Sequence, residues 1–450
     1  MPIMKIRSVP RIYTKYRKIF GIVPNVGTLK KIKELQKLEP VCMSGQSETI
    51  WDHAEEVNVY DVYGNKWLDF SSGVLITNAG HGNNAIVQAI INQVSKPLLT
   101  SYCFPNQPRI DLIKKIASLS PRGYKTLLLS TGSESTEVLL KLMRTYGSKI
   151  KKNRNIIISF QGAFHGRTLG AQQMGGSPAL KSWIKNIDSE IVQVPFPDGF
   201  RCKNTSFQLF KQSLNKLGIN PRNIAGVISE TYQGGGPYFF PKAYVKELRF
   251  WCNKYDILLC LDEVQSGFGR CGKQWGFQHY DIVPDLFAVG KGISSSLPIS
   301  AVIGRPDVMD LYGPNEMTST HSGNPVCCAA ALANINYIKN NKLIQNASKL
   351  GAILNSRLLE MQNCFPEFIG FVSSVGLVGG IHIVQQGTIK PDGELAKKIV
   401  NLCYKNGLMM FAPVGTGGAC IKIAPPLCIT EEALKEGCDV IFESLAELLH

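Results

Sequence analysis

The sequence predicts an α/β protein in which a large domain, built around a mostly parallel β-sheet flanked by helices, is followed by a smaller α+β domain. Two observations predict this. Short apolar runs alternate with helical patterns between about residues 85 and 310, as in βαβ units, whose parallel sheets are buried on both faces. After about residue 340 the pattern changes to long helices and short strands. The 450 residues suit two or three domains.

The N-terminal region divides into two segments. Residues 1–50 are expected to form a basic arm of turns and a short helix. Residues 51–84 are expected to form a hairpin segment that joins the small domain, because residues 58–70 alternate around a Gly64-Asn65 turn. The glycines and asparagines from Gly73 to Gly82 predict a loop.

The large domain is expected over residues 85–340. Strands are predicted at residues 125–130, 156–160, 224–229, 257–261 and 286–289, and helices at 134–146 and 244–255. The segment 298–304 follows the last of these strands without an intervening helix. Because parallel strands need a long crossover, this segment predicts an antiparallel member of the sheet.

The small domain is expected over residues 341–450. Helices are predicted at residues 342–362, 393–406 and 430–448, and short strands at 376–384, 408–411 and 420–423. Thr430 can cap the last helix, whose first turn carries Glu431 and Glu432.

The formal charge of +15 is partly local, because the first 33 residues hold nine Lys and Arg and no acid. Such an arm can bind nucleic acid or an anionic membrane. Its few aromatic residues and its lack of a repeat favour instead a solvated extension or an arm that wraps a second subunit. No nucleic-acid or membrane partner is therefore expected.

No apolar run approaches the roughly 18 residues that a spanning helix needs, and no secretory signal is visible at the N-terminus. The 13 cysteines form no Cys-x-x-Cys pair, and the seven histidines lack the spacing of zinc ligands. We therefore expect reduced thiols, a cytoplasmic protein and no metal site.

The residues with chemical potential follow predicted strands. Asp262 ends the run Leu-Leu-Cys-Leu that begins at Leu258, and Lys291 follows the run at 286–289. In an open parallel sheet, ligands bind at the carboxyl ends of the strands. A pyridoxal phosphate enzyme needs a lysine for a Schiff base and a carboxylate that faces the pyridinium nitrogen. A single lysine after a strand is more often a solvated charge, so this pair needs support from other segments.

Three further segments also follow predicted strands. Residues 130–137 place Gly132 and Ser133 at a helix N-terminus, which favours a phosphate, although a plain helix cap is the commoner explanation. Residues 160–168 carry Phe164, which can stack on an aromatic ring, and Arg167, which can grip a carboxylate. Residues 228–236 carry Glu230 and three consecutive glycines. Taken singly, each feature is more often structural.

Together these segments resemble the class III aminotransferases that use pyridoxal phosphate, a group that includes 4-aminobutyrate, ornithine and acetylornithine aminotransferases. The resemblance covers roughly residues 50–445. It rests on Thr-Gly-Ser-Glu at 131–134, Ala-Phe-His-Gly-Arg-Thr at 163–168, Asp-Glu-Val-Gln-Ser-Gly-Phe-Gly-Arg at 262–270, Gly-Lys-Gly at 290–292 and Thr-His-Ser-Gly-Asn-Pro at 320–325. It implies the fold type I of PLP-dependent transferases, whose large domain has a mostly parallel seven-stranded sheet.

The resemblance also implies roles for the catalytic residues. Lys291 would hold pyridoxal 5'-phosphate covalently as a Schiff base and later transfer a proton, which requires the neutral amine. Asp262 would pair with the pyridinium nitrogen. Gln265 would bond near the ring hydroxyl, and Glu230 would lie near the ring and Gln265.

The remaining cofactor contacts come from the same resemblance. Phe164 would stack on the ring with His165 beside it, and Gly132 and Ser133 would hold the phosphate. Thr320 would reach the phosphate from the partner subunit, which implies a homodimer that shares its active sites.

The substrate positions are Val74, Arg167, Gly235 and Lys422. Val74 follows Gly73, where relatives that use ornithine have a tyrosine, and Arg167 matches the arginine that grips the distal carboxylate of 4-aminobutyrate. Relatives carry a Glu/Arg pair where this chain has Gly235 and Lys422. Lysine keeps the positive charge but lacks the bidentate fork that suits a carboxylate.

We therefore expect an aminotransferase that moves the amino group of an ω-amino acid, such as 4-aminobutyrate, to 2-oxoglutarate or pyruvate by a ping-pong mechanism through pyridoxamine phosphate. One alternative is an aminotransferase for an amino sugar or another bulky amine. Aminomutases, racemases and a decarboxylase share the lysine and the aspartate. An alternative of another class is a basic protein that binds nucleic acid or membranes.

Overall fold

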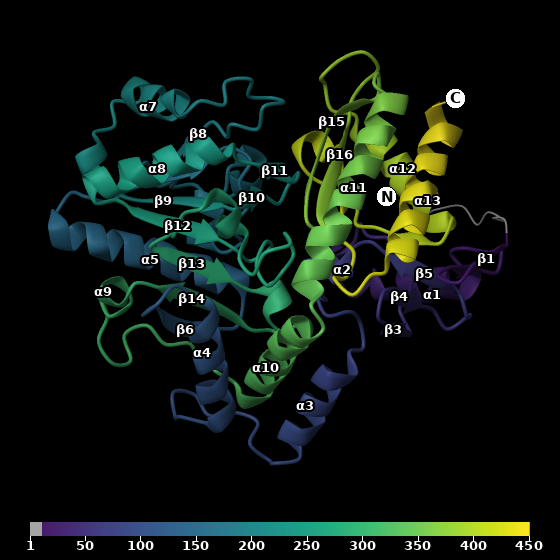
Figure 1. Ribbon diagram of the computed structural model, residues 1–450, viewed down its shortest axis with the longest axis horizontal. Helices are drawn as coiled ribbons and strands as arrows, with labels where there is room; N and C mark the ends of the chain where they lie inside the picture. The colour runs from purple at the N-terminus through teal and green to yellow at the C-terminus, as the bar shows by residue number, and fades with distance from the viewer. Residues whose placement is uncertain (1–10, 450) are drawn as a thin grey trace. The chain divides into compact units, whose positions relative to one another are not determined.

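A computed structural model describes residues 11–449, and the first ten residues of the predicted basic arm lie outside this range. The chain forms two compact units (Figure 1). One unit comprises residues 84–345, and the other comprises residues up to 83 together with those from 346 onward. Each unit has its own β-sheets and its own buried core.

The first unit is built on a seven-stranded sheet with the order β6-β14-β13-β12-β9-β7-β8. The strands are β6 (Lys125–Leu129), β7 (Ile156–Phe160), β8 (Ile191–Val194), β9 (Ile224–Glu230), β12 (Leu258–Asp262), β13 (Leu286–Val289) and β14 (Ser300–Gly304). The predicted fold class is confirmed, and β14 is the one strand antiparallel to its neighbours. One strand, β8, was not predicted from the sequence; it has four residues and lies at the edge of the sheet.

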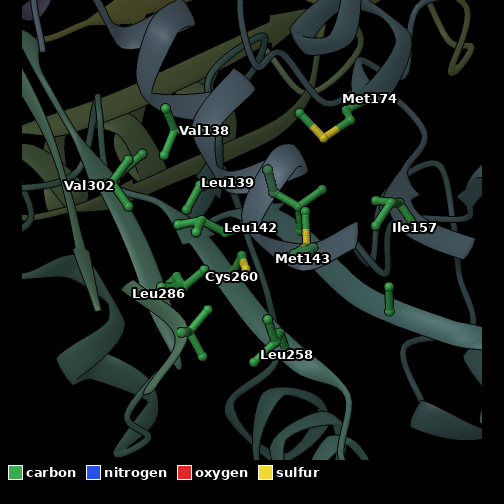
Figure 2. Close-up of a cluster of buried hydrophobic side chains, with 14 of the residues drawn as sticks. Val138, Leu139, Leu142, Met143, Ile157, Met174, Leu258, Cys260, Leu286 and Val302 are labelled. Carbon is green, nitrogen blue, oxygen red and sulfur yellow. The ribbon is translucent and has the colours of Figure 1, made fainter. Parts of the chain in front are cut away.

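Helix α5 (Gly132–Ile150) packs on one face of this sheet through a dense apolar cluster (Figure 2). Leu139, Leu142 and Met143 are fully buried against alternate residues of the strands, among them Leu258 and Cys260. Burying one such side chain contributes about 1.5–3 kcal/mol. Because side chains alternate along a strand, the residues in step with Leu258 and Cys260 face α5 as well.

Other helices complete this unit. Phe160 lies on the opposite face, because it alternates with Ile157. Phe210 of α7 (Phe207–Lys216) packs against it, and Trp251 of α8 (Lys242–Tyr255) packs against Phe210. Helix α10 (Pro325–Asn340) packs against two others, α3 (Asn84–Val94) and α4 (Gln107–Leu119). The shorter helices are α6 (Leu169–Met174) and α9 (Pro306–Met309).

The second unit contains two sheets. The three-stranded sheet has the order β15 (Ile369–Val375), β16 (Val378–Ile383) and β18 (Cys420–Ile423). The other joins β1 (Ile12–Tyr13), β2 (Lys18–Ile19), β5 (Lys66–Asp69), β4 (Asn58–Tyr60) and β3 (His53–Glu55), and β17 (Leu408–Met409) pairs with β5. The predicted hairpin at 58–70 is present as β4 and β5. The helices of the second unit include α12 (Gly393–Lys405), α13 (Glu431–Leu449) and most of α11 (Leu343–Cys364).

The described part of the basic arm folds onto this unit. Residues 12–19 form the β1–β2 hairpin, which was not predicted, and α1 (Val26–Leu35) follows it. Lys15 lies 2.7 Å from Glu432, and Arg17 lies 2.6 Å from Glu436. These two cations therefore already pair with acids of α13.

None of the helices within residues 11–449 is long and apolar enough to cross a lipid bilayer.

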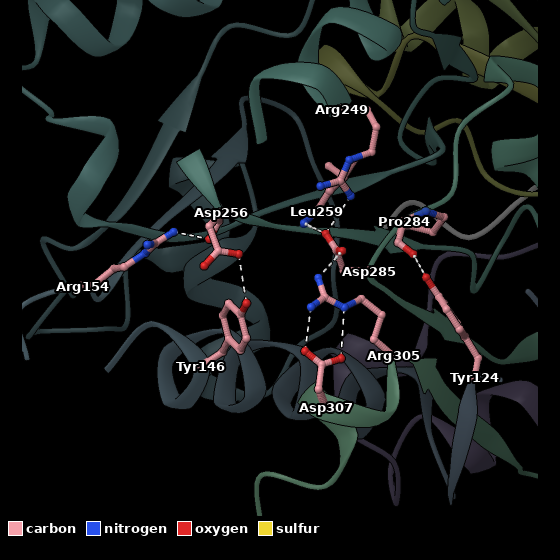
Figure 3. Close-up of polar contacts among 10 residues, drawn as sticks. All are labelled: Tyr124, Tyr146, Arg154, Arg249, Asp256, Leu259, Pro284, Asp285, Arg305 and Asp307. Atoms are coloured by element: carbon pink, nitrogen blue, oxygen red, sulfur yellow. Dashed lines mark hydrogen bonds and ion pairs between the residues drawn. The ribbon is translucent and has the colours of Figure 1, made fainter. Parts of the chain in front are cut away.

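A buried ion-pair network holds the amino ends of the central strands (Figure 3). Asp285 precedes β13 and accepts hydrogen bonds from the Leu259 N–H at 2.8 Å and from Arg249 at 2.7 Å. Its second oxygen accepts from Arg305 at 2.9 Å, and Arg305 also pairs with the exposed Asp307. One carboxylate thus ties β12, α8 and the end of β14 together.

The Asp285→Asn variant tests this network. Asparagine leaves the largely buried Arg249 without its counter-charge, and breaking a buried pair in this way costs about 3 kcal/mol. We expect the free energy of unfolding, measured by urea titration, to fall by about that amount. The matched control is Asp307→Asn, which removes an exposed partner of Arg305 and should cost less than about 1 kcal/mol. Equal losses in the two variants would contradict the assignment.

Candidate active site

A pocket lies at the carboxyl edge of the central sheet, on the face that α5 covers. Glu230 ends β9 and Asp262 ends β12, and the two residues are direct neighbours in the register of these parallel strands. Asp262 is in step with Leu258 and Cys260, so the alternation that builds the core also aims this carboxylate at the α5 side. The pocket encloses about 160 Å³.

Eight residues proposed from the sequence meet in this pocket. They are Gly132, Ser133, Phe164, His165, Glu230, Asp262, Gln265 and Lys291. Four lining residues were not singled out, namely Thr131, Gly166, Tyr232 and Val264. Each of these four lies within two residues of a proposed one, so including the two positions on either side of each proposed residue would have found them.

Lys291 follows β13 in a left-handed conformation with φ of 41°. Such a backbone is uncommon for a residue other than glycine and marks a strained position. The fully buried Asn334 of α10 holds the turn, since its amide donates to the carbonyls of Gly292 and Ile293 at 2.8 Å each. Ser295 in turn donates to Asn334. Asn334 therefore positions Lys291 without lining the pocket.

Burial lowers the pKa of the Lys291 ammonium below its usual range, although the negative charges of Asp262 and Glu230 oppose this shift. Taking a cation out of water disfavours the charged form. The pocket thus favours a neutral amine, which can act as a nucleophile or a base.

Asp262 is held from two sides. One oxygen accepts the Val264 N–H at 3.0 Å, and the other lies 2.9 Å from Nδ1 of His165. His165 is buried, and its carbonyl accepts a hydrogen bond from Thr136 of α5 at 2.6 Å. Its Nε2 atom is buried without a hydrogen-bond partner among the described residues. The imidazole therefore orients the carboxylate and presents an unsatisfied polar atom.

Glu230 is a second buried carboxyl beside Asp262. Its two oxygens accept the N–H groups of Phe164 at 2.9 Å and Gly234 at 2.8 Å. Burial raises the pKa of this carboxyl to about 7, His165 lowers it, and the neighbouring charge of Asp262 raises it. Near neutral pH the pocket thus holds one carboxyl that can be protonated.

The N-terminus of α5 forms another wall. Thr131 caps the helix, and the Glu134 carboxylate accepts hydrogen bonds from the N–H groups of Ser130 and Thr131. The loop after β7 approaches the helix closely at Gly166, where a Cβ atom would lie 2.3 Å from the Ser133 hydroxyl oxygen. Only glycine permits this approach, which leaves the first-turn N–H groups of α5 facing the pocket.

Gln265 packs against the glycine-rich hairpin that follows β9. A Cβ atom on Gly234 would lie 2.0 Å from the Gln265 amide nitrogen, so the backbone of the hairpin lies directly on this side chain. The buried Tyr232 donates to the Gln265 carbonyl at 3.4 Å. These contacts fix the position of Gln265 at the pocket wall.

The remaining proposed residues do not line this pocket. Arg167 is exposed, with its guanidinium 5.6 Å from the centre of the Phe164 ring. Gly235 is half-buried between β10 (Tyr232–Gln233) and β11 (Tyr238–Phe239). Thr320 is exposed in the segment before α10.

Val74 and Lys422 belong to the other unit. Val74 is half-exposed in the segment after β5. Lys422 lies in β18 in register with Gly380, and its side chain is buried with its ammonium 5.9 Å from the centre of the Phe411 ring.

Comparison with known proteins gives a uniform result. A family described as class III aminotransferases matches residues 43–445. An isoleucine 2-epimerase of Lentilactobacillus buchneri is 32% identical over 406 residues, which are 87% of this chain and 88% of the epimerase. A 4-aminobutyrate aminotransferase of Mycobacterium leprae is 30% identical over 96% of this chain and 98% of its own. A transaminase of the marine bacterium Virgibacillus superposes with a TM-score of 0.84 at 28% identity, covering 94% and 99% of the two chains.

The pKa of Glu230 predicts a pH-dependent stability. Between its ordinary value of 4.5 and about 7, the folded chain retains a proton that the unfolded chain has lost. The free energy of unfolding therefore falls as pH rises through this interval, by about 3 kcal/mol from this group. In Glu230→Gln this contribution is absent, so the variant should gain stability relative to the parent between pH 5 and pH 7.5 in urea titrations of cofactor-free protein.

A matched control is Glu247→Gln, which changes an exposed glutamate of α8. Its stability relative to the parent should not vary over the same pH range. If Glu230→Gln also shows a constant difference, the buried carboxyl does not titrate near neutrality.

Proposed function

The chain belongs to the class III aminotransferase family, and from this premise we propose that it moves the amino group of a terminal primary amine to an oxo acid in two half-reactions. The observation that carries the proposal is the pocket in which Lys291 is buried with Asp262 and Glu230. The donor proposed is an ω-amino acid such as 4-aminobutyrate, with 2-oxoglutarate or pyruvate as acceptor.

The family implies pyridoxal 5'-phosphate as the cofactor, and the residues of the pocket fit it. The N–H groups at the start of α5 suit the phosphate. Gly132 lets the Val264 side chain pack against the start of this helix, because a Cβ atom at 132 would lie 3.0 Å from it. The oriented carboxylate of Asp262 suits a pyridinium nitrogen, and Phe164 suits its ring. We assign Lys291 as the covalent attachment point, and Gln265, Glu230, Ser133 and His165 as further cofactor contacts.

When bound, pyridoxal phosphate accepts the electrons of a bond that breaks at the amine-bearing carbon. The protein residues supply the rest. Asp262 would keep the ring nitrogen protonated, and His165 would hold Asp262 in place. The Lys291 amine, neutral in its buried setting and free once the donor has taken its place on the cofactor, would remove the proton from the amine-bearing carbon and give it up again in the same half-reaction.

The proposed donor rests on Arg167 and Val74. The exposed guanidinium of Arg167 above Phe164 is suited to a distal carboxylate, and Val74 offers an aliphatic surface where relatives that use ornithine have a tyrosine. Gly235 and Lys422 replace a Glu/Arg pair. With no acid at 235, we expect the Lys422 ammonium to accept oxo acids that are held by a single charge contact.

We propose that the enzyme is a homodimer with shared sites. Thr320 is exposed and does not line the pocket of its own chain, which suits a contact to the phosphate of a partner. Large apolar side chains are exposed on and after α3, among them Ile91, Leu99 and Phe104, the last 74% exposed. A group of large exposed apolar side chains favours a protein interface.

A cytoplasmic location is proposed as well. All 13 cysteines are free thiols, a state that suits a reducing compartment.

A second candidate is epimerisation, favoured by the 32% identity to an isoleucine 2-epimerase. In that reaction Lys291 would remove the proton from one face of the amine-bearing carbon, a proton would return to the opposite face, and no acceptor would be consumed. A third candidate is an aminotransferase whose donor is an amino sugar or another bulky amine, which the missing side chain at Gly235 favours. Epimerisation differs from transamination in needing no acceptor, and the third candidate differs from the first in the donor that reacts.

Single additions of donor without acceptor test the function. We expect the yellow protein to bleach with 4-aminobutyrate or 5-aminovalerate, and Lys291→Ala to lower this rate by at least about 10³-fold because it removes the base. The spectrum is recorded by absorbance, and the colour should return with 2-oxoglutarate or pyruvate. If isoleucine exchanges its α-hydrogen for deuterium in deuterated water and the protein does not bleach, epimerisation is favoured.

Mixed dimers test the shared site. Lys291→Ala and Thr320→Arg should each be inactive as homodimers, because the first lacks its base and the second blocks the partner's phosphate site. Co-expression restores one complete site in every mixed dimer, so activity should recover to about a quarter of the parent's. If Thr320 serves its own chain, the mixture stays inactive.

A further inference from the structure

The segment after β5 contains a left-handed turn built from ordinary L-residues. Ser72, Gly73, Val74 and Leu75 have φ angles of 50°, 55°, 68° and 61°. One glycine could adopt such angles freely, but here three other residues do so, and one of them is β-branched. Such strain persists only where the surroundings impose it, and it gathers at binding sites.

A buried acid is hydrogen-bonded to the residue that precedes the turn. Asp69 is fully buried, and one of its oxygens accepts the Ser71 N–H at 2.7 Å. Its other oxygen lies 2.7 Å from Nε2 of His81, which is also buried. The Ser71 hydroxyl then accepts the Gly73 N–H at 3.1 Å. The chain of contacts runs from His81 through Asp69 to the middle of the turn.

Further contacts hold Ser72, at the start of the turn, and His81. The buried Ser72 hydroxyl donates to the Ala424 carbonyl at 2.6 Å, and the Ala424 N–H donates to Phe70. His81 itself is fixed, because its backbone exchanges two hydrogen bonds of 2.8 Å with Glu56. The edge of the Trp51 indole covers its ring at 5.7 Å.

Only the tip of the turn is open. Ser72 and Leu75 are buried, whereas Val74 is 49% exposed. A Cβ atom on Gly73 would meet nothing closer than 3.9 Å, so lack of space does not explain the glycine. The strained turn therefore holds the exposed side chain of Val74 in a fixed position.

We propose that Asp69 and His81 are positioning residues that set the donor preference of this enzyme by holding Val74 in the strained turn. The inference rests on the proposed function, in which Val74 touches the carbon chain of the amine donor. With the pair intact, Val74 limits which chain lengths and branches fit. Without the pair, the turn relaxes and the limit is lost.

The test compares His81→Leu, which removes the bond to Asp69, with His81→Gln, whose amide nitrogen can take the place of Nε2. The readout is the ratio of kcat/KM for 4-aminobutyrate to that for 5-aminovalerate. We expect at least a fivefold change in this ratio for His81→Leu and a return to within twofold for His81→Gln. The cofactor absorbance and the maximal rate of bleaching should remain those of the parent in both variants.

A double-variant cycle links the pair to Val74. Val74→Ala should change the same ratio in the parent but have no effect in the His81→Leu background, because the turn no longer holds that side chain. The matched control is His53→Leu, which removes an exposed histidine that also pairs with an aspartate, Asp52, at 2.8 Å. It should change neither the ratio nor the melting temperature.

Two results would overturn the inference. One is an unchanged ratio in a folded His81→Leu protein, and the other is an equal effect of Val74→Ala in both backgrounds. If none of the amine donors bleaches the parent protein, the proposed function is refuted instead, so the two failures are distinguishable.

Discussion

The burial of three ionisable groups at one sheet edge is the constraint on which the rest of the site depends. Lys291, Asp262 and Glu230 would each be better solvated alone, so they persist together only because each is held by specific contacts. Asp262 has His165 and a backbone N–H, and Glu230 has two backbone N–H groups. The glycine-rich hairpin and the loop at 163–168 fold closely around these acids for the same reason. The contacts that hold the ionisable groups in place therefore also determine the local fold.

Much of this could be predicted from the sequence because it follows from alternation. Strands β9, β12 and β13 are mainly apolar, as in sheets buried on both faces. β9 and β12 end in Glu230 and Asp262, and Lys291 follows the end of β13. Their register places Asp262 beside Glu230, which needs no knowledge of side-chain contacts. The antiparallel β14 could be predicted because its connection is too short for a crossover.

What could not be predicted depends on contacts distant in sequence. The edge strand β8 is too short to show a period, and the β1–β2 hairpin gains its stability from pairing with β5 and from the acids of α13. Asn334 lies 43 positions after Lys291 on an apolar helix, so nothing in its surroundings marks it as the residue that holds the lysine turn. The left-handed turn at 72–75 was predicted only as a loop, since its conformation is imposed by Asp69 rather than by its own residues.

The strained backbone at Lys291 and at Val74 has the same physical basis. Lys291 and Val74 both have positive φ without being glycine, and in both cases a buried polar residue from elsewhere in the same unit fixes the backbone, Asn334 for the first and Asp69 for the second. Strain of this kind lowers stability, and it is offset only by well-satisfied buried hydrogen bonds. Side chains at such positions cannot drift with the loop that carries them. A side chain that selects a substrate needs an anchor of this kind, because the same side chain on a mobile loop would alter affinity without altering selectivity.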